Sequence, residues 1–132
     1  MPDPDREIPE ESRRLVEQRQ QRTCIGCGGN GYEWHHRRSR RVREDHRHCP
    51  CNGVLLCRTC HSAAHGHHEE GRVRGLIVSQ WVDEPFLVPV MDARGGWWQL
   101  LCDGSYRALN LQQVVTDGFG GYLVDVVREE ET

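Results

Sequence analysis

Two Cys-x-x-Cys pairs limit what this chain can fold into more than any other feature of its sequence. Cys24 and Cys27 form the first pair, and Cys57 and Cys60 form the second, with 29 residues between the pairs. Four thiolates in two such pairs can close a tetrahedral zinc site, in which each pair forms a tight knuckle. Four unlinked buried thiols would require the same spacing to arise twice by chance. We therefore expect these four cysteines to bind a structural zinc ion.

The modest apolar content of the chain makes such an ion useful for folding. Only 36% of the 132 residues are hydrophobic, which is low for a self-sufficient core of this length, and a structural metal supplies free energy of folding. Seven cysteines would also suit a secreted disulfide framework, but no positively charged start with a following apolar run precedes them. No apolar run is long enough to cross a bilayer. We therefore expect a cytoplasmic protein without a membrane partner.

The charge of the chain is unevenly distributed. The net charge of −3 consists of −4 in residues 1–12, +7 in residues 13–60 and −6 in residues 61–132. A basic middle between acidic ends is expected when one surface binds phosphate groups. We therefore expect DNA as a partner, although an arginine run can also be a solvated face. The expected phosphate contacts are Arg37, Arg38, Arg40 and Arg41.

Apolar patterns and turn signals predict an α+β fold. Residues 1–9 predict a mobile tail, and a helix is expected from residue 10 to about residue 22, docking lightly because Leu15 and Val16 are its only sizeable apolar residues. Paired strands at 32–36 and 53–56 and a helix at 58–65 form the predicted core. The later expected elements are a helix at 69–76 and strands at 77–82, 87–91, 97–102 and 121–127. The predicted parts are a tail with a helix (1–22), a zinc-stabilised core (23–66) and a β-rich appendage (67–132).

Four histidines of the predicted core suggest a second metal site, with catalytic character. His61 and His65 lie four residues apart, which places both imidazoles on one helical face, whereas the adjacent His35 and His36 diverge in a strand. A divalent ion on His35, His61 and His65 would keep positions open for a phosphate oxygen and water. His36 could then act as a general base. The alternatives are a structural role for either strand histidine and an ion with two protein ligands, because His65 is the least certain of the three.

These residues resemble a known family. His35-His36, Asn52 and His61, together with the paired cysteines, resemble the HNH endonucleases of the ββα-metal fold, above all small phage and prophage members. The resemblance covers roughly residues 22–102, including the tail segments Arg74-Gly-Leu-Ile-Val and Val88-Pro-Val. It implies that His35 and His61 bind a metal ion, that His36 is the general base and that Asn52 orients it. Some members use a further ligand at the position of His65. Relatives often have a glycine-rich loop where this chain has residues 39–51.

The expected function follows from the residues and the resemblance together. We expect a metal-dependent DNA endonuclease that hydrolyses phosphodiester bonds, with a structural Zn²⁺ and one catalytic divalent ion, Mg²⁺, Mn²⁺, Ni²⁺ or Zn²⁺. The resemblance implies a phage-encoded protein in the host cytoplasm. Genes of the family commonly neighbour terminase genes, so terminase subunits are further expected partners in genome packaging. The alternatives are a zinc-stabilised nucleic-acid-binding module without catalysis and a packaging scaffold that contacts terminase through residues 72–128.

The remaining cysteines and histidines receive no catalytic role. One intervening residue makes an awkward chelate, and four other cysteines already complete a zinc shell, so Cys49 and Cys51 are expected to be free thiols or a redox-sensitive pair, with zinc ligation as the less favoured alternative. Cys102 alternates with Leu100 in a predicted strand and is expected in the core. Trp97 and Trp98 are expected to pack rather than to stack on bases. The histidines expected to be solvated loop residues are His46, His48, His67 and His68.

Overall fold

The computed structural model describes residues 8–39, 46–82, 84–110, 114–116 and 121–123. The predicted mobile tail therefore lies largely outside the described residues, as do Arg40 and Arg41. The fold is α+β, and its helices and small antiparallel sheets follow one another along the chain. No helix in the described part is long and apolar enough to cross a membrane.

A two-stranded hairpin followed by a helix carries most of the predicted core. Strand β1 (Glu33–His36) pairs antiparallel with β2 (Gly53–Leu56), so that Trp34 lies opposite Leu55, and helix α2 (Arg58–Gly66) follows at once. A Cβ atom on Gly53 would lie 2.1 Å from the Trp34 ring, so the glycine makes room for that ring. The predicted order of strand, strand and helix is confirmed.

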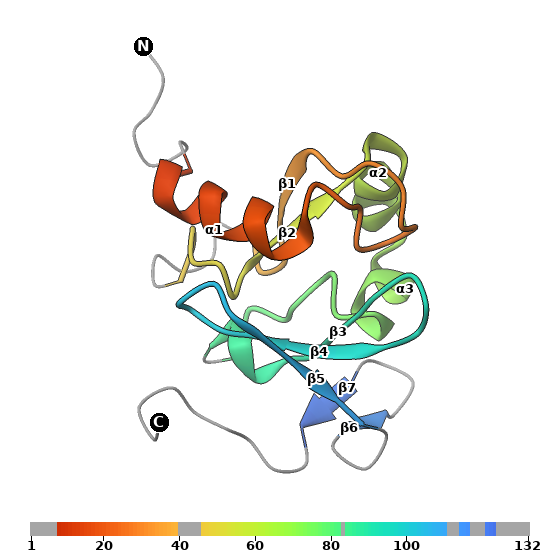
Figure 1. The fold of residues 1–132 in the computed structure, drawn as a ribbon. Coiled ribbons are helices and arrows are strands. Elements are labelled where there is room, and N and C mark those ends of the chain that lie inside the picture. The colour runs from red at the N-terminus through yellow and green to blue at the C-terminus, as the bar shows by residue number, and fades with distance from the viewer. Residues whose placement is uncertain (1–7, 40–45, 83, 111–113, 117–120, 124–132) are drawn as a thin grey trace.

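Helix α1 (Glu10–Gln20) lies across this hairpin (Figure 1) and docks through polar side chains as well as through Val16. Val16 is fully buried with Trp34 and Leu55. The Gln20 amide accepts a hydrogen bond from the Leu55 N–H at 2.8 Å and donates one to the Leu55 carbonyl at 3.0 Å. Gln20 thus pairs with the outer edge of β2 as a neighbouring strand would. The helix is held more firmly than its few apolar residues predict.

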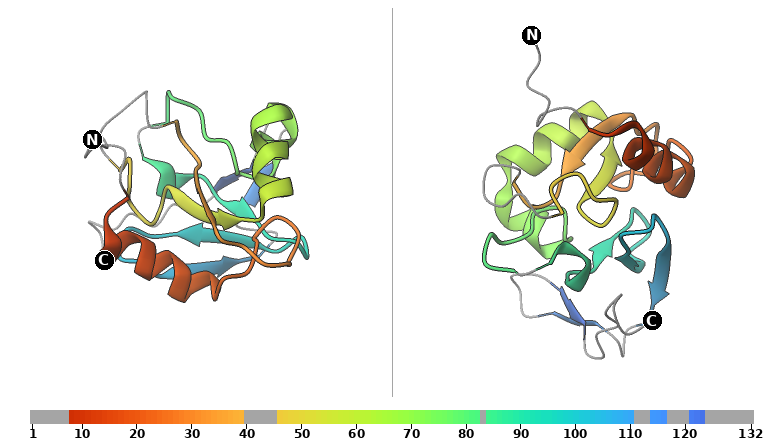
Figure 2. Two further views of the ribbon diagram at one scale, coloured as in Figure 1. Left: turned by 90° about the horizontal axis from the view of Figure 1, so that it is seen from above. Right: turned by 90° about the vertical axis from the view of Figure 1, so that its left-hand side faces the viewer.

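The described elements after α2 form a second layer, which lies beneath the hairpin in Figure 1 and is seen from two other sides in Figure 2. Strands β3 (Val90–Met91), β4 (Trp97–Leu100) and β5 (Tyr106–Leu109) form one antiparallel sheet, in that order. The other elements are α3 (His68–Val73), the 3₁₀ helix η2 (Pro85–Leu87), β6 (Val114–Thr116) and β7 (Gly121–Leu123), with β6 paired to β7.

The strand prediction was only partly correct in this layer. The predicted strand at 77–82 is wrong, because the segment is irregular and the Val78 N–H donates to the Arg37 carbonyl at 2.8 Å instead of joining a sheet. Pro85 starts a 3₁₀ turn that shortens the predicted strand at 87–91 to Val90 and Met91. Strands β5 and β6 were not predicted from the sequence. Residues 124–127 of the last predicted strand lie outside the described residues.

The two layers share one apolar core. Its buried members come from the first Cys-x-x-Cys knuckle at 24–27, from β2, α2, β3 and β4, and from the segment after α3. They are Cys24, Val54, Leu56, Ala64, Leu76, Val90 and Leu100. The boundary predicted at residue 66 therefore passes through a continuous packed interior. Residues 67–110 help to hold the hairpin and α2 in place.

The guanidinium group of Arg37 joins the segments that surround this interior. Arg37 is 1% exposed, and its Nε donates to the Gly75 carbonyl at 2.8 Å. One Nη atom donates to the carbonyls of Cys51 and Pro85 at 2.8 and 3.2 Å, and the other donates to Val88 at 2.5 Å. Burial lowers the pKa of Arg37 to about 10, so the group is still a cation at neutral pH. Carbonyl dipoles of three segments therefore solvate this charge in place of water.

The predicted phosphate contacts of Arg37 and Arg38 are wrong. Arg38 is 2% exposed, and its guanidinium group donates to the Val82 carbonyl at 2.8 Å. Both side chains point into the protein because the chain that leaves β1 after His36 is covered by the irregular segment after residue 76, whose Val78 N–H donates to the Arg37 carbonyl. A run of arginines in a sequence does not distinguish a solvated face from buried guanidinium groups that pair with backbone carbonyls.

Replacing Arg37 should destabilise the protein strongly. We expect Arg37→Ala to lower the free energy of unfolding by at least about 3 kcal/mol, because several buried carbonyls lose their donor. Urea unfolding followed by circular dichroism measures this change. Arg14→Ala is the matched control, since Arg14 is 57% exposed and pairs only with side chains of its own helix. Equal effects of the two substitutions would contradict the role given to Arg37.

Candidate functional site

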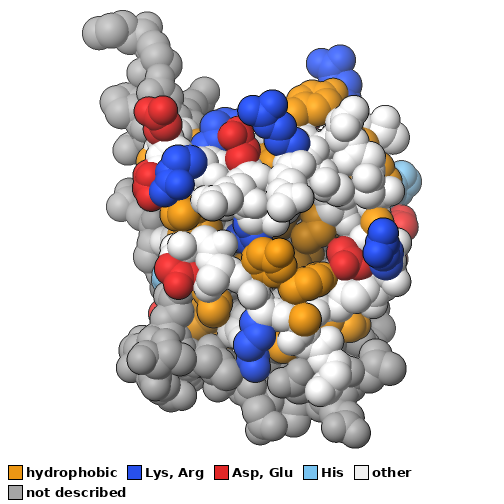
Figure 3. All heavy atoms as spheres, in the orientation of Figure 1, with side chains coloured by type: hydrophobic (Ala, Val, Ile, Leu, Met, Phe, Trp, Pro, Cys, Tyr) orange, Lys and Arg blue, Asp and Glu red, His pale blue; other side chains and the backbone are white. Residues whose placement is uncertain are grey.

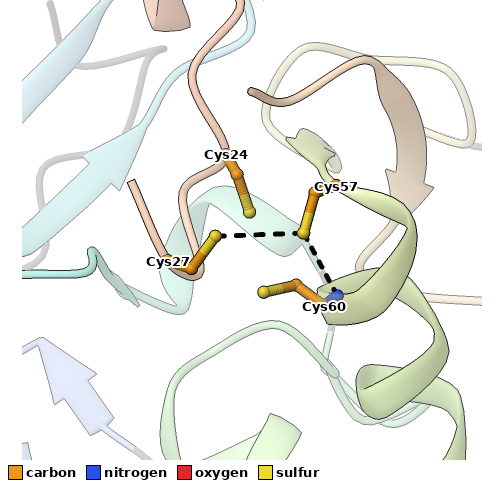
Figure 4. Close-up of side chains that lie close together, drawn as sticks. All are labelled: Cys24, Cys27, Cys57 and Cys60. Atoms are coloured by element: carbon orange, nitrogen blue, oxygen red, sulfur yellow. Dashed lines mark hydrogen bonds between the residues drawn. The ribbon is translucent and has the colours of Figure 1, made fainter. Parts of the chain in front are cut away.

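The four cysteines of the Cys-x-x-Cys pairs converge as predicted (Figure 4). Their sulfur atoms all lie within 4.8 Å of one another, and they could bind a metal ion. Cys27 Sγ lies 3.9 Å from Cys57 Sγ, against about 3.8 Å for two sulfurs on a tetrahedral zinc with Zn–S bonds of about 2.3 Å. Gly28 follows the first pair with a φ of 82°, the left-handed conformation that a knuckle turn requires.

The second cysteine pair fixes the start of α2. Cys57 is the residue that caps the helix, and its sulfur accepts a hydrogen bond from the Cys60 N–H at 3.4 Å. This bond lowers the pKa of Cys57 to about 7, so the thiolate that a metal requires forms near neutral pH. The four-cysteine group thereby ties the knuckle at 24–27 to the first turn of the helix that carries His61 and His65.

His35, His61 and His65 form a second group of ligand type. One ring nitrogen of each lies within 4.8 Å of the other two. His61 Nε2 and His65 Nε2 are 3.1 Å apart, because one turn of α2 stacks the two side chains over β1. The centroid of the His35 ring lies 5.1 Å from that of His61 and 5.3 Å from that of His65. The structure thus brings together all three predicted ligands, and the group could hold a metal ion.

The buried His35 presents an unpartnered nitrogen in this group. Its Nε2 lies 2.6 Å from the Leu76 carbonyl, which can only accept, so Nε2 carries the proton and Nδ1 carries the lone pair. His35 Nδ1 is buried and has no hydrogen-bond partner among the described residues. Burial lowers the pKa of His35 to about 3, so the ring is neutral at physiological pH. A buried, neutral and unpaired imidazole nitrogen is rare in proteins and fits a metal ligand.

Glu33 orients His61 and is not among the predicted site residues. His61 Nδ1 donates to a Glu33 carboxylate oxygen at 2.8 Å, which leaves the His61 Nε2 lone pair directed at His65. Carboxylates commonly hold metal-binding histidines in this way and set their tautomer. The period of two along β1 could have revealed it, because Glu33 and His35 lie on the same face of the strand.

His36 lies beside the three histidines. A cavity of about 570 Å³ is lined by His35, His36, His61 and His65, among others. His36 Nε2 is 3.2 Å from His48 Nδ1, so His48, which was expected to be a solvated loop residue, is a neighbour of the predicted base. The segment after α3 closes another part of the cavity with Ile77 and Val78.

Asn52 acts on the backbone. Its side-chain oxygen accepts from the Arg38 N–H at 2.7 Å, and its amide group donates to the carbonyls of Arg38 and Arg47 at 3.1 and 3.2 Å. Its own carbonyl accepts from the Arg37 N–H at 2.8 Å. Asn52 therefore fixes the chain that leaves β1 directly after His36. Its support of a base at His36 stays a prediction.

A third group was not predicted. His46, Cys49, Cys51 and Cys102 place one ligand atom each within 4.8 Å of one another. Cys102 lies just after β4 in the turn to β5, and its sulfur faces His46, so the expectation that it packs in the core is wrong. Trp97 and Trp98 do pack, since Trp97 is buried and Trp98 Nε1 donates to Asp92 at 2.8 Å.

Comparisons with models of known protein families, with curated proteins and with solved structures found no match for this chain. The chemistry of the site therefore has to be inferred from its own residues. On the face drawn in Figure 3, arginine side chains lie among acidic ones and apolar side chains occupy the centre. That face does not gather the basic charge expected of a phosphate-binding surface.

Loss of the Glu33 carboxylate should weaken metal binding at the histidine group. We expect Glu33→Gln to lower the affinity for Ni²⁺ about 10-fold to 100-fold, because His61 loses the partner that sets its tautomer. Titration calorimetry of zinc-loaded protein with Ni²⁺ measures the change. Glu69→Gln, at an exposed position in the first turn of α3, is the control and should leave the affinity unchanged. Unaltered affinity in Glu33→Gln would contradict the assignment of His61 as a ligand.

Proposed function

We propose that this protein is a metal-dependent DNA endonuclease whose reacting centre is the cavity lined by His35, His36, His61 and His65. One observation carries the proposal. The unpartnered Nδ1 of buried His35 belongs to one ligand group with two histidines of α2, and His36 lies beside that group. This combination of a histidine metal group and a separate histidine on a strand, strand and helix unit also underlies the resemblance to HNH endonucleases.

The three histidines would hold the catalytic divalent ion. Such an ion, when bound, supplies positive charge that stabilises charge developing on the phosphate and the leaving oxygen. The contribution of the chain is to aim the three imidazoles at one point. Burial keeps His35 neutral, and the hydrogen bond from His61 Nδ1 to the Glu33 carboxylate leaves the Nε2 lone pair of His61 for the ion. Burial, together with the neighbouring His61, also lowers the pKa of the more exposed His65.

His36 is the proposed general base. A neutral imidazole can take the proton from the attacking water, since its usual pKa lies near working pH. His48 Nδ1, at 3.2 Å from His36 Nε2, can hold the ring in one orientation or exchange a proton with it. Asn52 limits the movement of the backbone that follows His36. In this proposal, the base is positioned by contacts from the 46–52 segment.

Arg72 and Trp81 are the proposed DNA contacts next to this cavity. Both line a second cavity of about 350 Å³, which shares Ser39 and Val78 with the first one. Trp81 is 82% exposed, although tryptophan is usually buried. Exposed aromatic rings beside arginines stack on bases or wedge between them. We propose that Arg72 and Trp81 contact the DNA, in place of the buried Arg37 and Arg38. The partnership with phage terminase in genome packaging stays a prediction from the family resemblance.

Loss of the proposed base should abolish cleavage and leave binding intact. We expect His36→Ala to lower the rate of plasmid cleavage with Mg²⁺, Mn²⁺ or Ni²⁺ by at least about 100-fold, with unchanged affinity for DNA and for Ni²⁺. Gel assays of plasmid forms and fluorescence anisotropy of a labelled duplex measure the two effects. The control is His67→Ala, at an exposed position between α2 and α3.

A comparison variant separates binding from chemistry. Trp81→Ala should weaken DNA affinity and retain the cleavage rate at saturating DNA. Equal, metal-independent nicking by wild type and His36→Ala would reject the proposed mechanism. Binding without any cleavage by the wild type would favour the alternative, a zinc-stabilised nucleic-acid-binding module.

A further inference from the structure

His46, Cys49, Cys51 and Cys102 form a ligand group for which the proposed endonuclease activity gives no role. The first three belong to the segment that leads into β2, whereas Cys102 lies in the turn between β4 and β5. The ligand atom of Cys49 lies within 4.8 Å of those of Cys102, Cys51 and His46. Three sulfurs and one imidazole nitrogen from two distant parts of the chain thus meet at a single point.

The distances in this group fit a tetrahedral zinc ion. His46 Nδ1 lies 3.6 Å from Cys51 Sγ and 3.4 Å from Cys102 Sγ. Zn–S bonds of about 2.3 Å and Zn–N bonds of about 2.0 Å at tetrahedral angles place sulfur and nitrogen about 3.5 Å apart. Three thiolates and one imidazole are a ligand set that zinc commonly takes in structural sites.

His46 is oriented for this role. Its Nε2 lies 4.0 Å from a Glu84 carboxylate oxygen, and its Nδ1 faces the sulfurs. A carboxylate on the far nitrogen favours the tautomer that keeps the Nδ1 lone pair for a metal. The backbone of His46 has a φ of 62°, which is in the left-handed region that favours glycine.

The surroundings supply charge that complements the site. A zinc ion with three thiolates and a neutral imidazole carries one net negative charge. The buried guanidinium of Arg37 donates to the Cys51 carbonyl, and Arg19 donates to the Pro50 carbonyl at 2.9 Å and to the Gly53 carbonyl at 2.6 Å. Two arginines therefore bind the backbone of the loop that carries Cys49 and Cys51. Buried positive charge beside the site favours thiolates over thiols.

We propose that His46, Cys49, Cys51 and Cys102 bind a second structural zinc ion. The ion ties the loop before β2 to the β4–β5 turn, so it links the two layers of the fold. Its ligands also bracket His48, the neighbour of His36. The second zinc thereby holds the loop that positions the proposed base, just as the four-cysteine group fixes the start of α2.

Cadmium NMR of the full chain tests this proposal. The protein is purified under reducing conditions and its bound metal is exchanged for ¹¹³Cd²⁺, whose chemical shift distinguishes four sulfur ligands from three sulfurs and one nitrogen. We expect two signals of equal intensity, one of each type. Cys102→Ser should remove only the mixed signal and halve the thiolate-bound cadmium, and the matched variant Cys60→Ser should remove only the four-sulfur signal.

The wild-type spectrum decides the question even when a variant fails to fold. A single four-sulfur signal in the wild type would overturn the proposal, and so would a mixed signal that persists in Cys102→Ser. Mass spectrometry after alkylation without reductant provides a second measurement. A disulfide between any two of Cys49, Cys51 and Cys102 in the purified protein would also overturn it, whereas three alkylated thiols after removal of the metal would support it.

Discussion

The buried guanidinium group of Arg37 is the interaction on which the rest of the structure depends. Its four carbonyl partners lie in segments with different tasks. Gly75 precedes Leu76, whose carbonyl fixes the tautomer of His35, and Cys51 belongs to the third ligand group. Pro85 follows Glu84, which faces His46. The Arg37 cation thus fixes the relative positions of the histidine cavity and of the unpredicted group of His46 and three cysteines. Because this cation is buried, it is unavailable to DNA.

Two groups of potential metal ligands join parts of the fold that a larger protein would hold together by apolar packing. The four-cysteine group joins the knuckle to the start of α2, and the group at 46–51 and 102 joins the hairpin layer to the sheet layer. Between them lies a small shared core. In the proposed account, zinc ions at both positions make the fold more rigid than this small core alone can make it. The histidines of β1 and α2 lie on the elements that the ions hold, so their positions are fixed as well. The proposed catalytic residues therefore lie between two cross-links.

Local spacing explains which parts could be predicted. The two cysteine pairs, the strand pair and the four-residue spacing of His61 and His65 are short patterns, and in each case the structure brings together the residues that the pattern predicts to be neighbours. Arg37 and Arg38 misled the prediction because a charged run is usually solvated, and only the tertiary fold shows the carbonyls that receive them. Cys102 lies 51 residues after Cys51, and no local period connects them. The segment 77–82 has an apolar composition typical of a strand but no neighbouring strand to pair with among the described residues.

The central claim is that His35, His61 and His65 bind one divalent ion through nitrogens that the structure already orients. Anomalous diffraction from crystals of the full chain grown with Ni²⁺ tests this claim most directly, because it locates the ion. The account predicts a nickel peak at bonding distance, about 2.1 Å, from His35 Nδ1, His61 Nε2 and His65 Nε2. A cavity without a peak, in crystals that hold nickel elsewhere, would contradict it, and so would a peak on His61 and His65 with His35 turned away.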